Sequence, residues 1–131
     1  EDGAYIVPLN FAYVPGKPAK FYFHSAKEGR KVDMIGQGAK AGFELDGAHR
    51  LGEAETGCRH TFFYQSVIGT GTVRPVETLE EKKRALSAIM AHYRKDCAFS
   101  FTDEQADGLL PDGGNDELQA AQLRRRKNER I

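Results

Sequence analysis

The sequence is poor in several residue types, and each shortage limits what the protein can be. It has no tryptophan, two cysteines and two methionines, and Lys plus Arg equals Asp plus Glu at 19 each. The balanced charge gives no reason to expect nucleic acid or a membrane as a partner. No apolar run approaches the roughly 18 residues that a membrane-spanning helix needs. Cys58 and Cys97 could form one disulfide, but two thiols fit a reducing compartment at least as well. We therefore expect a soluble, cytoplasmic protein.

The length of 131 residues fits one folded domain, which we place at residues 1–102. Residues 103–131 form a polar carboxy-terminal segment with a basic tail between Arg124 and Arg130. Such a tail is usually solvated, and it lacks the interleaved aromatic residues that single-strand binders use, so we expect no nucleic acid. At the other end, Glu1-Asp2-Gly3 has the composition of a turn between two strands, and we expect a strand to precede it.

Two-residue alternation of apolar and other side chains predicts several strands. The strands are expected at residues 5–13, 20–24 and 41–45, and a long one at 60–76 that Gly69 and Gly71 bend. The polar, glycine-containing stretch 46–57 is expected to be a loop. Pro8 cannot donate a ladder hydrogen bond, which places it at an edge, a bulge or a point where the backbone meets a ligand.

Three helices are expected. The first covers residues 27–35 and is capped by Ser25 or a neighbour. The second runs to about Tyr93 from a capping box in which Thr78 and Glu81 satisfy each other's backbone donors. The third covers residues 116–130, although its large apolar residues are limited to Leu118 and Leu123.

The stretch from Phe21 to Lys31 carries the most chemistry. A strand there delivers His24 and Ser25 toward a helix start, and Arg30 and Lys31 follow directly. A forked guanidinium and a point-charge ammonium are suited to a phosphate, as are unpaired amide hydrogens at a helix start. An exposed Arg-Lys pair on a helix is otherwise most often a solvated surface, and Ser25 could be a cap and nothing more.

Three motifs in the same order and spacing resemble the FMN-binding split barrels related to pyridoxamine 5'-phosphate oxidase, and in particular the nitroimidazole-reductase-like members. They are Pro8-Leu9-Asn10-Phe11, then Phe23-His24-Ser25-Ala26 with Gly29-Arg30-Lys31, then Ser66-Val67-Ile68 with Gly69 and Gly71; His92-Tyr93 also matches. The resemblance spans about residues 2 to 95. It implies a mainly β protein with accessory helices, a dimeric Greek-key split β-barrel with FMN between two subunits.

The resemblance also implies the site residues. Residues 8–11 would lie along the flavin ring, the phosphate would be held after the second strand, and the long strand would reach the ring edge or ribityl chain near the dimer seam. The implied cofactor-binding residues are Pro8, Leu9, Asn10, Phe11, Phe23, His24, Ser25, Arg30, Lys31, Gln65, Ser66 and Val67. The amino-terminal helix and first strand of the family pattern are absent before Glu1, and the final strand expected near residues 105–120 is replaced by turn residues and the basic tail.

Several functions remain open at this point. The first is an FMN-dependent oxidoreductase that takes electrons from a reduced nicotinamide-type donor to a small organic acceptor, such as a nitroaromatic compound. A second is a split barrel that stores or senses flavin or haem, and a third is a flavin-free interaction module. No catalytic acid or base can be named; His24 and Tyr64 are candidates. Cys58 and His60 have no second ligand pair nearby, so we expect no metal site.

Overall fold

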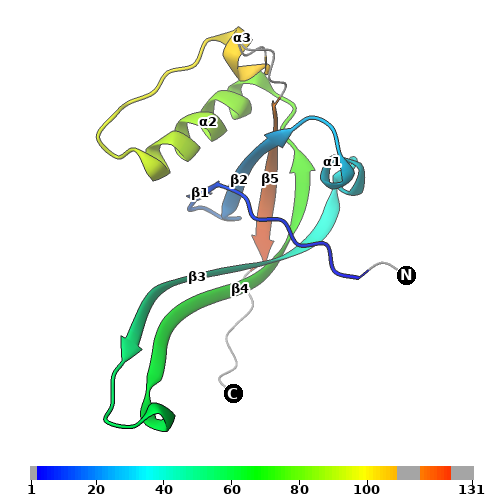
Figure 1. Cartoon of the computed structure of the whole chain (residues 1–131). Helices are drawn as coiled ribbons and strands as arrows, with labels where there is room; N and C mark the ends of the chain where they lie inside the picture. The colour runs from blue at the N-terminus through cyan, green and yellow to red at the C-terminus, as the bar shows by residue number, and fades with distance from the viewer. Residues whose placement is uncertain (1–2, 109–115, 125–131) are drawn as a thin grey trace.

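The computed structural model describes residues 3–108 and 116–124, which form an antiparallel sheet with helices on its surface (Figure 1). The sheet order is β1-β2-β5-β4-β3. The strands are β1 (Phe11–Val14), β2 (Lys20–Ala26), β3 (Ala39–Gly52), β4 (Thr61–Pro75) and β5 (Asp116–Arg124). The helices are α1 (Arg30–Ile35), the 3-10 turn η1 (Gly57–Arg59), α2 (Leu79–Tyr93) and α3 (Asp103–Ala106). The prediction of a mainly β protein with accessory helices is confirmed.

Three predicted elements, β2, β4 and α2, form where the sequence pattern placed them. The Thr78 hydroxyl accepts a hydrogen bond from the Glu81 amide at 3.3 Å, which confirms the threonine cap. The second half of the predicted capping box is wrong. The Glu81 carboxylate turns toward the sheet, where it meets three stronger donors than the amide of Thr78.

Four boundary predictions are wrong. Strand β1 begins at Phe11, and residues 3–10 lie outside any strand or helix. Strand β3 continues through the predicted loop as far as Gly52, with an irregularity between Gly47 and Arg50 that keeps it paired to β4. Helix α1 is only six residues long, and its cap is Gly29, with no side-chain hydrogen bond. Ser25 therefore cannot cap it, because Ser25 lies inside β2.

The predicted carboxy-terminal helix is a strand within the described residues. Residues 116–124 form β5, which pairs with β2 from Lys20↔Gln122 to Ala26↔Asp116 and with β4 from Thr70↔Arg124 to Pro75↔Gln119. Residues 125–130, the rest of the predicted helix, lie outside the described residues. Strand β5 thus lies between β2 and β4 in the sheet. It is the late strand of the family pattern that was not recognised in the sequence.

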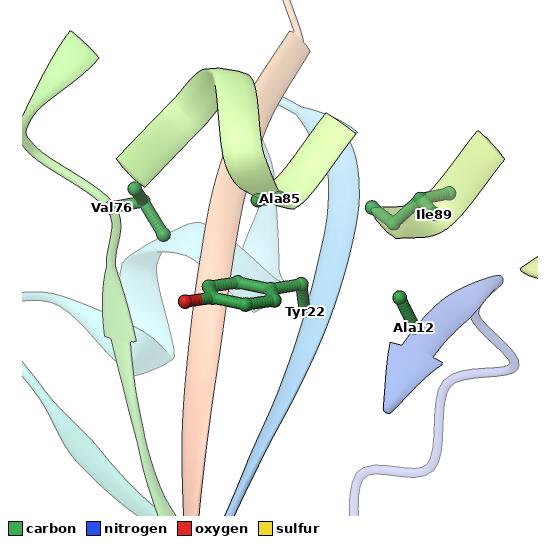
Figure 2. Packing of buried hydrophobic residues seen from close by; sticks show 5 residues of the cluster. All are labelled: Ala12, Tyr22, Val76, Ala85 and Ile89. Atoms are coloured by element: carbon green, nitrogen blue, oxygen red, sulfur yellow. The ribbon is translucent and has the colours of Figure 1, made fainter. Parts of the chain in front are cut away.

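Helix α2 covers one face of the sheet, and the buried core lies between them (Figure 1). Figure 2 shows Ala12 and Tyr22 of the sheet facing Ala85 and Ile89 of α2, with Val76 at the end of the layer. All five are at most 5% exposed. Burial of this small cluster fixes the position of α2 on the sheet.

A buried ionic cluster adds to this contact. The Glu81 carboxylate accepts hydrogen bonds from Lys20 and Tyr22 of β2, each at 3.0 Å, and from Arg74 of β4 at 3.1 Å. Burial alone would raise the pKa of the Glu81 carboxyl, but these hydrogen bonds outweigh it and hold the pKa at about 2. The same hydrogen bond to Glu81 raises the pKa of the Lys20 ammonium. Glu81 thus links the first turn of α2 to two strands.

The β3–β4 hairpin extends away from the rest of the sheet (Figure 1). We call residues 44–68 the arm, because β4 pairs with β5 from Thr70 onward and with β3 alone before it. Large apolar side chains on both faces of the arm are exposed: Leu51, Phe62, Phe63, Tyr64, Val67 and Ile68 are 47–77% exposed. The arm thus carries an exposed apolar surface on a two-stranded ribbon.

Candidate functional site

An open hollow of about 320 Å³ lies where the amino-terminal segment crosses the end of β2. Pro8, Leu9 and Asn10 line it from residues 3–10, and His24 lines it from β2. Four of the predicted site residues, from two segments of the chain, therefore meet at one place. The lining offers apolar side chains, one amide and one imidazole, which suits a flat aromatic ligand with polar edges.

Phe11 and Phe23 stand opposite each other where β1 pairs with β2. Phe11 packs edge-on against Phe21 at 5.4 Å between ring centroids, and Phe23 lies 6.2 Å from the same ring. Both are predicted site residues. Phe11 directly follows the lining residue Asn10 in sequence, and Phe23 directly precedes the lining residue His24. The structure places them in an aromatic cluster around Phe21, and neither is among the residues that line the hollow.

Arg30 and Lys31 occupy the first two positions of α1. Cations at this end of a helix oppose its dipole, so helix stability does not account for them. The guanidinium carbon of Arg30 lies 4.9 Å from the centre of the Tyr5 ring. The segment 3–10 thus touches Arg30 through Tyr5 and lines the hollow through Pro8 to Asn10. Stacking uses the face of a guanidinium and anion binding uses its edge, so the two contacts are compatible.

Gln65, Ser66 and Val67 are not among the residues that line the hollow. They lie on β4 within the arm, opposite Gly47, Asp46 and Leu45 of β3, and all three are exposed. Within one chain, the structure does not bring these predicted site residues together with His24. Tyr64, one candidate acid or base, lies beside them and is 63% exposed.

Two contacts near the hollow were missed by sequence reasoning. Tyr5 was assigned to a strand, but its ring lies under Arg30. The Tyr93 hydroxyl accepts a hydrogen bond from the backbone amide of Phe11 at 3.1 Å, across 82 residues of sequence. Only the match of His92-Tyr93 to the family pattern pointed to this position, because a helix-end tyrosine carries no local signal of a distant partner.

Within residues 3–108 and 116–124, no group of three or more His, Cys, Asp or Glu side chains is arranged to hold a metal ion. Cys58 and Cys97 are both free thiols. Across those same residues, no helix is long and apolar enough to cross a membrane.

Comparison with known proteins assigns the family. Residues 1–108 match the family described as pyridoxamine 5'-phosphate oxidase, and the chain belongs to this family. The family is generally one of flavin-dependent oxidoreductases, and it typically binds flavin. The sequence-based recognition is thereby confirmed.

A crystal structure from Bacteroides thetaiotaomicron VPI-5482, provisionally named a 5-nitroimidazole antibiotic resistance protein, is similar in sequence and fold. It is 30% identical, with a TM-score of 0.66, and the match covers 92% of this chain. The chain spans 65% of the length of that neighbour. No curated protein sequence matches the chain.

Proposed function

We propose that the protein is an FMN-dependent oxidoreductase that takes electrons from a reduced nicotinamide-type donor to a small organic acceptor. The observation that carries the proposal is the meeting of Pro8, Leu9, Asn10 and His24 in one hollow, with Arg30 of α1 in contact with the same segment through Tyr5. Family membership supports flavin chemistry. The Bacteroides neighbour favours nitroaromatic compounds as the acceptor class.

The residues present fit a flavin. Pro8 and Leu9 would contact the apolar ring, the Asn10 amide can pair with its polar edge, and His24 lies on the other side of the hollow. Bound FMN would supply reversible two-electron transfer, and the protein would orient the ring and leave one side of it open.

We assign the phosphate of FMN to Arg30 and Lys31, with His24 and Ser25 on the strand side. With six residues, α1 is too short for its dipole to contribute much, so the side-chain cations carry this assignment.

We further propose that the working protein is a homodimer with FMN between the two copies. The hollow of about 320 Å³ is at the lower end of the roughly 300–1,000 Å³ of ligand pockets, and it is open on one side. The exposed apolar arm supplies a surface for a second copy. Gln65, Ser66 and Val67 of that copy could then complete the site, which would explain why they lie apart from His24 within one chain.

Replacing both cations tests the phosphate assignment. The double variant Arg30→Ala with Lys31→Ala is expected to bind FMN at least tenfold more weakly, about 1.4 kcal/mol or more, because two charge-assisted contacts are lost. Affinity is measured by titration, following the visible absorption of the flavin. Riboflavin lacks the phosphate, so in the variant it should lose less affinity than FMN; any loss that it shows reflects the missing contact of Arg30 with Tyr5.

Lys27→Ala with Lys40→Ala, which removes two exposed lysines outside the assigned site, is the matched control and should bind FMN like the unmodified protein. Equal FMN affinity in the Arg30/Lys31 variant and the control would refute the phosphate assignment. Turnover is tested separately, by reducing the bound flavin with a nicotinamide and reoxidising it with a nitro compound. Flavin that binds but is not reduced would favour the storage or sensing alternative.

A further inference from the structure

The segment that lines the hollow has no regular structure of its own. Residues 3–10 lie outside every strand and helix of the sheet, and Pro8 has no amide hydrogen to donate. A ligand that lies along Pro8, Leu9 and Asn10 can be held in one orientation only if this segment is fixed from outside. The contacts at its two ends therefore decide how well it is positioned.

The upstream end is fixed at Tyr5, whose ring lies under the Arg30 guanidinium at 4.9 Å. The downstream end is fixed at Phe11, one residue beyond the lining. Its amide donates to the Tyr93 hydroxyl at 3.1 Å, and its ring lies 4.9 Å from the His92 ring. Tyr93 thus holds the point at which the irregular segment becomes strand β1.

Tyr93 is the last residue of α2, a helix that is firmly attached to the sheet. Ala85 and Ile89 of α2 are buried in the core, and Glu81 bonds to β2 and β4. The tyrosine itself is 51% exposed, so packing in the core does not explain its presence at this position. Its hydroxyl offers the amide of Phe11 an acceptor fixed by the helix.

The geometry points to Tyr93 as a positioning residue for the flavin ring, acting through the backbone of residues 8–11. This inference rests on the proposed function and deepens it. Tyr93 orients the segment against which the ring lies, whereas Arg30 and Lys31 bind the phosphate. The Arg30/Lys31 variant should therefore lose more affinity for FMN than for riboflavin, whereas loss of the Tyr93 hydroxyl should weaken the binding of both by the same factor.

The test is Tyr93→Phe, which removes the acceptor oxygen and keeps the ring that packs on His92 at 4.8 Å. We expect FMN and riboflavin to lose affinity by the same factor, about three- to tenfold, as for loss of one hydrogen bond. The visible absorption of bound flavin should shift, and the unfolding midpoint of the flavin-free protein should stay the same. Tyr13→Phe, a tyrosine of β1 that is 50% exposed, is the control and should change none of these.

Three outcomes would overturn the inference, and they are distinguishable. If Tyr93→Phe binds both flavins with unchanged affinity and spectrum, Tyr93 has no positioning role and the proposed function survives. If the unmodified protein binds neither flavin, the proposed function fails and this inference fails with it. A loss of affinity for FMN alone would also contradict the inference, because it would place Tyr93 in the phosphate site.

Discussion

Replacing Glu81 with alanine is expected to lower the free energy of unfolding by about 3 kcal/mol, because it leaves two cations and a hydroxyl beside an empty buried position. The Glu81 side chain is 10% exposed, and its partners Lys20 and Arg74 are 29% and 34% exposed. Their partial exposure keeps the loss at the lower end of what breaking a buried ion pair costs. Chemical denaturation followed by circular dichroism measures the loss.

Glu80→Ala is the matched control, because Glu80 is in the same first turn of α2 and is exposed. It removes the same favourable charge from the helix start without touching the cluster, and its effect should be below about 1 kcal/mol. If both variants lose the same stability, the cluster contributes nothing beyond the helix dipole.

The same cluster predicts acid sensitivity. The carboxyl of Glu81 has a pKa of about 2 in the folded protein, against 4.5 as its ordinary value. Between these two pH values the unfolded chain binds more protons, so falling pH favours unfolding. About 3 kcal/mol of stability, present above pH 4.5, should be lost as the pH falls toward 2. In Glu81→Gln this part of the pH dependence should disappear, and an unchanged pH profile in that variant would contradict the assignment.

A charge placed on the arm is expected to disrupt the proposed dimer. Ile68 is 77% exposed in a single chain, so Ile68→Glu should cost the monomer little. Buried against a second copy, the same carboxylate would lack a partner, and the dimer should dissociate at least 100-fold more readily. Sedimentation equilibrium measures this change, and circular dichroism checks that the variant is folded.

Met34→Glu is the control for the arm, because Met34 is an apolar residue of α1 that is 53% exposed and lies outside the arm. It should leave the oligomeric state unchanged. A dimer that tolerates Ile68→Glu would mean that the arm is not the interface, and a monomeric unmodified protein would remove the dimer proposal altogether.

Local patterns predicted the parts of the fold that local forces determine. The alternation at 20–24 and 60–76 and the threonine cap at Thr78 located β2, β4 and the start of α2, because each depends on neighbouring residues. Strand β5 could not be predicted this way. Its residues Glu117 to Leu123 favour a helix in isolation, and pairing with both β2 and β4 overrides that preference.

The residues of the candidate site also differ in whether a sequence pattern could predict them. The family pattern indicated Pro8 to Asn10 and His24, which the fold does bring together. The contacts of Tyr93 with Phe11 and of Glu81 with Lys20 and Arg74 join residues far apart in sequence, so no local pattern could have shown them. The role of the Glu81 side chain was predicted wrongly, because the capping-box pattern already accounted for a glutamate at this position.

The central feature of the proposed function is a flavin that binds at the hollow with its phosphate near α1. Titration of the unmodified protein with FMN and with riboflavin tests this directly. We expect both to bind with altered visible absorption, and FMN to bind at least tenfold more tightly, about 1.4 kcal/mol. Equal affinity for the two would contradict the phosphate site, and binding of neither would contradict the flavoprotein assignment.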